Sequence, residues 1–288
     1  EIYTLSLHDA LPIFDCHKFC ESTYEEAFLQ LLEDNDWSYT CGDDIHRKLD
    51  ETLIEDDLRT YLCNKYKAEH LTDDEISAIV AHLRNTGDVS DYLTLRKTFT
   101  LYRDGYVFKR FEDGKNPLPL DYIDFDEPSN NVFRAVNQFT VSYNAGKFTR
   151  RPDVLLFING IPVCIIELKN PAKKSATIED AYVQIHSRYK RDIPHLMRYC
   201  AISCISDAAN TRLGTTYSDY IHYYAWKKVE NEDPSANKGV PQLVTLIKGA
   251  YTPKRILQLL RDFVYFPDVS SGREEESKIG RASCRERV

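Results

Sequence analysis

Residues 150–171 read Arg150-Arg151-Pro152-Asp153-Val154-Leu155-Leu156-Phe157-Ile158-Asn159-Gly160-Ile161-Pro162-Val163-Cys164-Ile165-Ile166-Glu167-Leu168-Lys169-Asn170-Pro171. Two apolar runs lie on either side of an Asn-Gly pair, which is the strongest short-range signal for a β-hairpin. Asp153 precedes the first run, while Glu167 and Lys169 end the second. The sequence therefore predicts a central hairpin with charged residues at its open end.

The geometry of the turn decides whether these charged residues meet. Alternate residues of a strand point to opposite faces of a sheet, so Glu167 and Lys169 share a face. A plain two-residue turn would place Asp153 opposite Ile166, on the other face. A three-residue loop with Gly160 left-handed in a G1 bulge would bring Asp153 to the shared face. We therefore predict a bulged turn.

The residue types suggest metal-dependent chemistry. Two carboxylates on neighbouring strand ends can hold a hard divalent ion through oxygen ligands, and Mg²⁺ is the ion we expect. A bound metal activates water and stabilises charge on a phosphodiester, and Lys169 can orient the water or neutralise the developing charge. A hairpin with a solvated Asp and a surface Glu-Lys pair fits the same residues. The short pattern alone leaves both interpretations open.

Basic residues gather around this hairpin although the whole chain is acidic, with a formal net charge of −8. Between Lys147 and Arg191 there are nine Lys or Arg residues and four Asp or Glu residues, a local charge of +5. Positive charge of this kind favours binding to a phosphate backbone. A solvated basic face is the alternative interpretation.

Several further segments extend the pattern: Asn131-Val132-Phe133-Arg134-Ala135-Val136-Asn137-Gln138-Phe139, Arg151-Pro152-Asp153, Asn159-Gly160-Ile161-Pro162, Glu167-Leu168-Lys169-Asn170-Pro171 and Tyr189-Lys190-Arg191-Asp192-Ile193-Pro194. Together they resemble the N-terminal nuclease region of the restriction subunit of type I restriction-modification enzymes, over residues 22–268. The resemblance implies a PD-(D/E)xK nuclease. The expected fold is α/β (α+β), with a mixed central β-sheet flanked by helices, and is restriction endonuclease-like.

The resemblance also implies a function. It predicts Mg²⁺-dependent cleavage of double-stranded DNA, with Asp153, Glu167 and Lys169 as the catalytic set and the two carboxylates as metal ligands. The implied partners are the modification (methyltransferase) and specificity subunits. An ATP-driven translocase follows the nuclease in that family, and this chain has no GxxxxGK[ST] motif. ATP is therefore expected only for the full-length subunit. A repair or recombination nuclease of the same fold, or a catalytically silent scaffold, are the alternative functions.

A predicted N-terminal helix supplies a further candidate. Ser22 or Thr23 is expected to cap it, with an apolar stripe behind. Glu25 leans toward the apolar side of this helix, whereas Glu26 leans outward. In the resembled family an acidic residue of this helix approaches the metal site, so Glu25 is the candidate third metal ligand. A capping-box role remains open for both glutamates.

The helix capped by Thr177 carries a second family pattern. The family has Gln-x-x-x-Tyr, a contact that steadies DNA beside the metal, but here Gln184 and Tyr189 are five residues apart. That spacing is about 140° around an α-helix. Either Arg188 takes the place of the tyrosine or the helix end is overwound. We call the basic residues between Lys147 and Arg191 the basic track. Together with this track, the helix gives six DNA-binding candidates: Gln184, Arg188, Tyr189, Lys173, Lys174 and Arg151.

Hydrophobic periodicity predicts the remaining elements. Helices are expected over residues 51–66, 73–85 and 253–265, and strands over 199–206 and 243–248. Residues 98–102 and 106–110 are expected to form a hairpin around Arg103-Asp104-Gly105. No apolar run is long enough to span a membrane, and the eight cysteines show no metal-type spacing. We therefore expect a cytoplasmic protein without a membrane partner.

The two ends of the chain are interpreted differently. The codons for residues 4–13 and those for residues 279–288 can be reverse complements of each other, as a sequencing adaptor at both ends of a fragment would produce. Residues 1–13 and 279–288 are therefore predicted to be artefacts and excluded from the fold. We divide the rest into a helical N-terminal part (14–95), a nuclease core (96–268) and a linker that starts at residue 269.

Overall fold

A six-stranded mixed sheet forms the centre of the protein. The computed structural model describes residues 21–112, 114–169, 177–207, 209–229, 242–267 and 278–279, with the backbone alone for 21–23 and 278–279. The strand order is β1-β4-β7-β8-β9-β10. The bounds are β1 Ser38–Cys41, β4 Phe133–Asn137, β7 Val154–Ile158, β8 Ile161–Leu168, β9 Ile202–Ser206 and β10 Thr211–Thr215. The β1–β4 and β8–β9 pairs are parallel and the others antiparallel. The predicted mixed sheet is confirmed.

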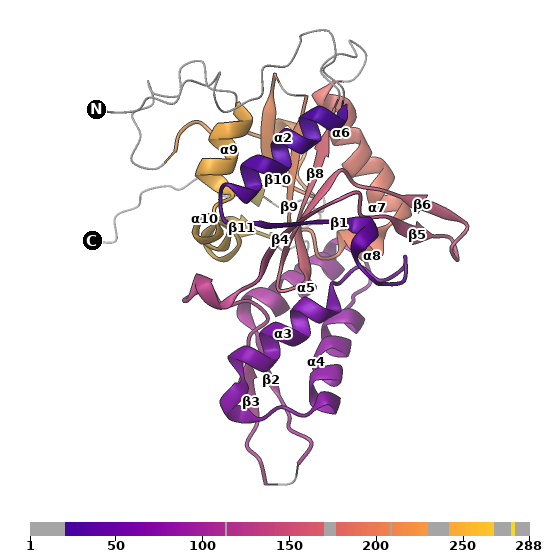
Figure 1. Cartoon of the computed structure of the whole chain (residues 1–288). Helices are drawn as coiled ribbons and strands as arrows, with labels where there is room; N and C mark the ends of the chain where they lie inside the picture. Colours follow the sequence, from indigo (N-terminus) through magenta and orange to yellow (C-terminus); the bar gives the residue numbers. More distant parts are fainter. Residues whose placement is uncertain are drawn as a thin grey trace, which may run out of the picture.

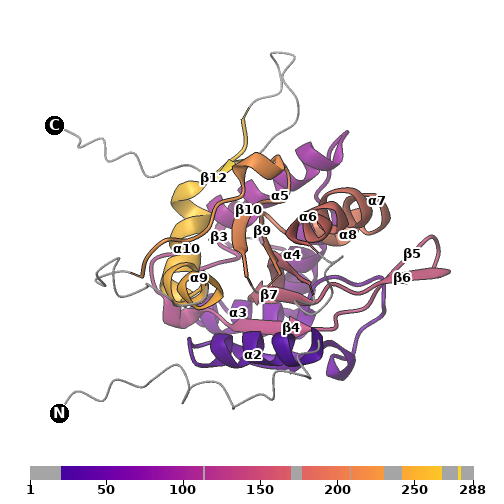
Figure 2. The ribbon, with the colours of Figure 1, turned by 90° about the horizontal axis from the view of Figure 1, so that it is seen from above.

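Helices cover both faces of this sheet (Figures 1 and 2). One face carries α2 (Glu21–Glu33), α9 (Gln242–Ala250) and α10 (Pro253–Gln258), and the other carries α6 (Ile178–Val183), α7 (Lys190–Asp192) and α8 (Pro194–Met197). Leu156 and Ile166 belong to the core on the first face, while Leu155 and Ile165 belong to the core on the second. Strands buried on both faces need continuous apolar runs, which explains the composition of the central hairpin.

A helical lobe lies at one end of the sheet (Figure 1). It consists of α3 (Glu55–Lys65), α4 (Asp73–Asn85), α5 (Asp91–Asp104) and the small β2–β3 ribbon (Tyr106–Phe108 and Leu118–Leu120). The predicted helix over residues 73–85 is confirmed, and Thr72 and Glu75 form a capping box at its start. Short 3₁₀ turns span Gly42–Asp44, Lys67–Glu69, Pro128–Asn130 and Tyr220–His222.

Three local predictions are wrong. The hairpin expected over residues 98–110 is largely α5, because Tyr92, Leu95, Phe99 and Tyr102 recur at helical spacing and are all buried. The strand expected over residues 243–248 is α9, whose buried residues follow the same period. Helix α2 already begins at Glu21, so the residues expected to cap it lie within the helix. In α5 and α9 the short β-type composition is overridden by burial of one helical face.

The division at residues 95 and 96 falls inside α5, while α2 and β1 pack with the sheet. Of the predicted artefact segments, Ile279 pairs with Val264 in a two-stranded ribbon, β11 (Val264–Tyr265) with β12 (Lys278–Ile279). Residues 1–13 and 280–288 lie outside the described residues. Within the described ranges, no helix is both long and apolar enough to cross a membrane.

The central hairpin contains a bulge, but not at its turn. Asn159 and Gly160 form a two-residue turn with φ angles of 50° and 74°, and Ile158 pairs with Ile161. The register shifts further along, between the pairs Phe157–Pro162 and Leu156–Cys164, so Val163 is the extra residue. The predicted bulged turn is therefore wrong in its position. Proline has no N–H for a strand ladder, and Pro162 makes this part of β8 a natural place for a bulge.

The tight turn is held by the helical lobe. The N–H of Ile54 donates to the carbonyl oxygen of Gly160 at 2.9 Å, and a side chain on Gly160 would overlap the carbonyl oxygen of Ile54. The buried Asn159 side chain accepts from the N–H of Val132 at 2.8 Å and donates to the carbonyl of Tyr122 at 3.0 Å. The turn thus has no room for a third loop residue.

Gly160→Ala should destabilise the protein more than Gly146→Ala. Both glycines have a positive φ, of 74° and 81°, and a left-handed alanine costs roughly 1–2 kcal/mol. Only Gly160 adds a backbone overlap, because nothing lies within 4 Å of the equivalent position at Gly146. Chemical denaturation of both variants measures the difference. Equal losses of unfolding free energy would contradict the packing described for the turn.

Candidate active site

The bulge brings two carboxylates to one end of the hairpin. Val154 pairs with Ile166 in the shifted register, so Asp153 stands opposite Glu167, on the same face. The N–H of Leu168 donates to Oδ2 of Asp153 at 2.7 Å, which fixes the aspartate against the end of β8. Asp153 and Glu167 therefore lie on the same face of the sheet, as the sequence analysis expected.

A closed ring of hydrogen bonds surrounds Glu167. The Lys169 ammonium donates to Oε1 of Glu167 and to Oε1 of Gln184, both at 2.8 Å. Nε2 of Gln184 donates to the Tyr189 hydroxyl at 2.7 Å, and that hydroxyl donates to Oε2 of Glu167 at 3.0 Å. Both oxygens of Glu167 are thereby held by residues that the sequence had nominated.

A π-helical segment makes this ring possible. Residues Gln184–Tyr189 form η4, a π-helix that continues α6. Its i→i+5 hydrogen bonding widens the turn, so Gln184 and Tyr189 reach the same face despite their five-residue spacing. The helix is therefore underwound, and the expected overwinding is wrong. The exposed Arg188 does not replace the tyrosine in the ring.

Burial and crowding change the protonation of Glu167. Its side chain is 1% exposed, and burial, followed by the negative charge of Asp153, raises its pKa to about 8, against the opposing effects of Lys169 and Tyr189. Burial and the neighbouring Glu167 also raise the pKa of Tyr189, which keeps its hydroxyl a hydrogen-bond donor. Two carboxylates pressed together in this way fit a divalent cation, which would neutralise both.

Glu25 lies beside this site rather than in the ring. Its buried carboxylate accepts from Nδ2 of Asn137 at 2.7 Å and from Nε2 of Gln138 at 2.8 and 3.0 Å. The N–H of Gln138 donates to the carbonyl oxygen of Asp153 at 3.2 Å. Within the described ranges, no three His, Cys, Asp or Glu residues are grouped to hold a metal. A metal-ligand role for Glu25 stays a prediction.

Gln138 is a site residue that the sequence analysis missed. Its φ of 56° is in the left-handed region, which non-glycine residues adopt at a cost and which often marks functional sites. This conformation turns the chain at the end of β4 so that the backbone of Gln138 meets Asp153 while its side chain reaches Glu25. The local sequence has no glycine, and the turn-favouring Asn137 beside it does not mark Gln138 itself as left-handed.

The DNA-binding candidates divide into three groups. Gln184 and Tyr189 belong to the ring. Arg151 and Arg188 join them in lining a small cavity of about 160 Å³, together with Thr149 and Arg150. Lys173 and Lys174 lie outside the described residues. The structure thus gathers four of the six candidates around one opening.

Comparisons with known proteins agree with this geometry. The family model described as "Type I restriction enzyme R protein N terminus (HSDR_N)" matches residues 18–220, more than half of the chain. The chain belongs to this family. The HSDR_N fold is restriction endonuclease-like, as the six-stranded sheet with flanking helices shows.

Curated relatives of this HSDR_N chain are endonuclease subunits. The type I restriction enzyme HindI endonuclease subunit of Haemophilus influenzae is 30% identical over 265 residues, which cover 88% of this chain and 24% of that protein. The putative MjaIXP endonuclease subunit of Methanocaldococcus jannaschii is 35% identical over 159 residues, covering 49% and 15%. The chain thus spans about a quarter or less of the length of these relatives.

The basic track of the HSDR_N chain is partly neutralised. Arg150 and Arg191 both donate to the buried Asp192, each through Nε at 2.7 Å, and Arg191, then Arg150, lower the pKa of Asp192 to about 2. Arg151 lies 3.4 Å from Asp43. Asp192 directly follows Arg191, the last residue of the segment 147–191. The charge of +5 for that segment therefore overstates the exposed positive charge.

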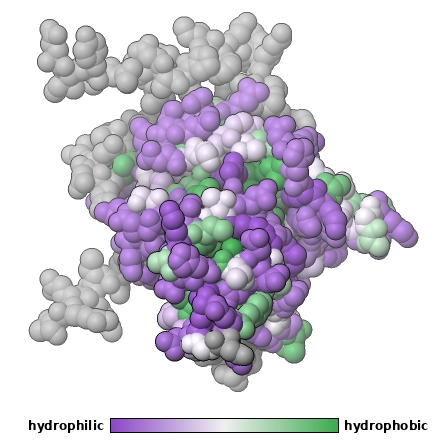
Figure 3. Space-filling model, turned by 60° about the horizontal axis from the view of Figure 1, so that its bottom comes forward, coloured by the Kyte–Doolittle hydropathy of each residue, from purple (hydrophilic) through white to green (hydrophobic). Residues whose placement is uncertain are grey.

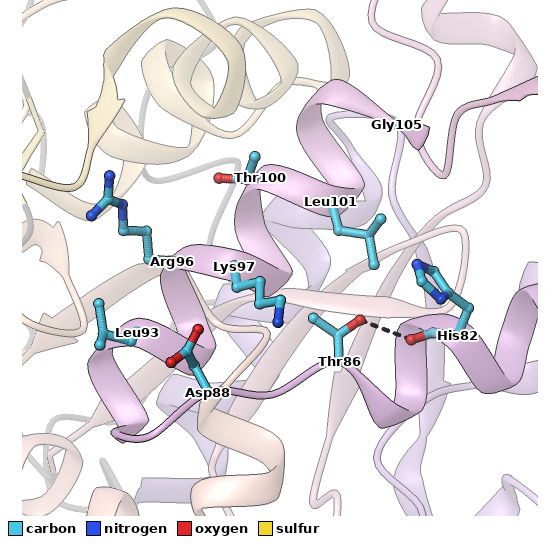
Figure 4. A pocket seen from close by; sticks show the side chains of 9 residues that line it. All are labelled: His82, Thr86, Asp88, Leu93, Arg96, Lys97, Thr100, Leu101 and Gly105. Carbon is cyan, nitrogen blue, oxygen red and sulfur yellow. Dashed lines mark hydrogen bonds between the residues drawn. The ribbon is translucent and has the colours of Figure 1, made fainter. Parts of the chain in front are cut away.

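A larger cavity in the helical lobe of the HSDR_N chain lacks this chemistry (Figure 4). It is lined by His82, Thr86, Asp88, Leu93, Arg96, Lys97, Thr100, Leu101 and Gly105. Thr86 donates to the carbonyl of His82 at 2.8 Å, and the Lys97 ammonium donates to the carbonyl of Gly87 at 3.0 Å. Asp88 is its single carboxylate, so this cavity has no acid pair.

Glu167→Gln should change the pH dependence of stability in metal-free protein. The raised pKa of about 8 means that the contribution of Glu167 to stability is fully present below its unfolded pKa of about 4.3 and is lost as pH rises through about 8. The variant removes this loss, so its melting temperature relative to wild type should rise between about pH 5 and pH 9.

The matched control is Glu26→Gln, an exposed glutamate of α2. Melting curves in EDTA across the pH range measure both variants. A constant difference between Glu167→Gln and wild type across this range would show that Glu167 is not held in a perturbed environment.

Proposed function

We propose that this chain is the Mg²⁺-dependent endonuclease module of a type I restriction enzyme R subunit, and that it hydrolyses phosphodiester bonds in double-stranded DNA. The observation that carries the proposal is the buried Glu167, held by Lys169 and Tyr189 and facing Asp153. A carboxylate with a raised pKa and a specific charged partner is the kind of group found at catalytic sites. The family match supports the same conclusion.

Each residue has a proposed role. Asp153 and Glu167 would hold Mg²⁺, which supplies a polarised phosphodiester and an activated water when bound. Lys169 would orient the attacking water or neutralise charge on the phosphate, because its ammonium is fixed beside Glu167. Gln184 and Tyr189 would act as positioning residues, since they hold Lys169 and Glu167 in place.

Arg151 and Arg188 are proposed to bind phosphates of the DNA. Both side chains are exposed, and both line the cavity that also touches Gln184 and Tyr189. Guanidinium groups bind phosphate oxygens through paired donors. Lys173 and Lys174 come five and six residues after the end of β8 at Leu168 and are proposed to extend this contact.

The wider setting of the module is also a proposal. The relatives are named endonuclease subunits of type I restriction enzymes and are several times longer than this chain. We expect modification and specificity subunits as partners, an ATP-driven translocase in the full-length subunit and a cytoplasmic location. The paired carboxylates favour an active nuclease over a silent scaffold, and the family match favours a restriction subunit over a repair nuclease.

Plasmid nicking tests the proposal. Purified protein should nick supercoiled plasmid with Mg²⁺ and not with EDTA. Asp153→Ala, Glu167→Gln and Lys169→Ala should each abolish nicking, because each removes part of the catalytic set. Glu26→Gln is the control that should retain it. Nicking that survives all three substitutions would overturn the assignment, and melting temperatures will show whether each variant is folded.

A one-residue deletion tests the role of the π-helix. Deleting the exposed Ser187 shortens the Gln184–Tyr189 spacing to four residues, which an ordinary α-helix places on one face. Nicking should be retained, because the ring can still close. Inserting one alanine after Ser187 should abolish nicking with the fold intact. If the insertion is active, closure of the ring is not needed for the reaction.

A further inference from the structure

The hairpin formed by β5 (Val141–Tyr143) and β6 (Phe148–Arg150) projects from the body of the protein. Figures 1 and 2 show it extending away from the sheet and from all the labelled helices. Val141 and Ser142 at its base are buried, whereas residues 144–149 are exposed. The buried base anchors the ribbon to the body of the protein, and the exposed tip is the part that a partner could contact.

The chemistry of the tip suits an anionic partner with apolar parts. Residues 141–151 contain Lys147, Arg150 and Arg151 and no acidic residue. Arg150 is paired with Asp192 and Arg151 lies 3.4 Å from Asp43, so the exposed Lys147 carries the positive charge of the tip. Phe148 is 55% exposed, and its ring centroid lies 5.6 Å from that of Tyr143. In the space-filling view the projecting hairpin carries both hydrophilic and hydrophobic surface (Figure 3).

The base of the hairpin is rigidly attached. Nε of Arg150 donates to the buried Asp192 at 2.7 Å, and the Arg150 guanidinium lies 5.4 Å from the centre of the Tyr143 ring. The N–H of Ser142 donates to the carbonyl of Leu49 at 2.8 Å. These contacts fix the direction in which the hairpin points, relative to the sheet.

The hairpin is continuous with the candidate active site. Thr149 and Arg150 of β6 line the cavity whose other wall is formed by Gln184, Arg188 and Tyr189. Gln184 and Tyr189 in turn contact Lys169 and Glu167. A polymer lying across the active site would therefore meet the hairpin next.

We infer that the β5–β6 hairpin is a DNA-binding arm that contacts the duplex beside the bond to be cut. In this arm Lys147 binds a phosphate, and Phe148 packs against apolar atoms in a groove of the DNA. The inference rests on the proposed function. Double-stranded DNA is the occupant that the arm fits, because its tip lacks acids and its base lines the cavity beside Gln184 and Tyr189. A two-stranded β-ribbon also fits the major groove of DNA.

Two substitutions separate the predicted contacts. Binding of a fluorescent duplex is measured in EDTA, where no cleavage is expected, over a range of salt concentrations. Lys147→Ala should lower the affinity and reduce the slope of log K against log salt by about 0.9, the value for one lost phosphate contact. Phe148→Ala should lower the affinity several-fold and leave that slope unchanged, because it removes an uncharged contact.

The β2–β3 ribbon provides matched controls. Phe111, which follows β2, is 59% exposed and lies 5.8 Å from Phe108 between ring centroids, so it resembles Phe148 in exposure and packing. Lys109 is an exposed lysine of the same segment. Lys109→Ala and Phe111→Ala should bind DNA as wild type does. All four variants should melt close to wild type, because the substituted side chains are exposed.

The outcomes distinguish failure of this inference from failure of the proposed function. Wild-type protein that neither binds nor nicks DNA would overturn the nuclease proposal itself. Wild-type protein that nicks DNA, while both hairpin variants bind like the controls, would overturn only the role of the arm. Loss of self-association by the hairpin variants, with DNA binding unchanged, would assign the arm to a second copy and likewise overturn the inference.

Discussion

The extra residue in β8 is the constraint on which the site depends. Without Val163 as a bulge, the pairing set by the Asn159-Gly160 turn would continue and place Asp153 across from Ile166. The acid pair would then be divided between the two faces of the sheet. With the bulge, Asp153 stands opposite Glu167, and β7 and β8 still bury apolar side chains on both faces.

A second irregularity completes the arrangement in the neighbouring helix. The π-helical turn η4 accommodates one residue more than an α-helical turn and brings Tyr189 back to the face of Gln184. The bulge and the π-helix thus do the same thing in a strand and in a helix: each absorbs one residue so that polar side chains converge. Bulges and π-helices are both frequent beside functional sites.

The consequence is a buried carboxylate that the surrounding fold stabilises from several sides. Lys169 and Tyr189 bind the two oxygens of Glu167, while burial and then the charge of Asp153 raise its pKa. Next to this centre, Gln138 has a left-handed backbone and contacts both Asp153 and Glu25. Asp192 of α7 accepts a hydrogen bond from Arg150 and so links α7 to the β5–β6 hairpin. The helical lobe has a buried polar contact of its own, because Nε of Arg110 donates to Oε1 of the buried Glu75 at 2.7 Å.

The sequence by itself determined the central hairpin, because apolar runs on both sides of Asn-Gly leave few other structures, and it singled out Asp153, Glu167 and Lys169 by type and spacing. Gln184 was nominated through the family resemblance, although its spacing to Tyr189 differs from the family pattern. It misassigned α5 and α9, whose β-type residues become helical through long-range burial. Only the tertiary structure decided where the bulge lies, because the packing of Gly160 against Ile54 leaves no room at the turn. It also decided that Tyr189 closes the ring, that Gln138 joins the site and that Asp192 neutralises two arginines. These outcomes depend on residues far apart in the chain, or on a helical irregularity, that no local pattern encodes.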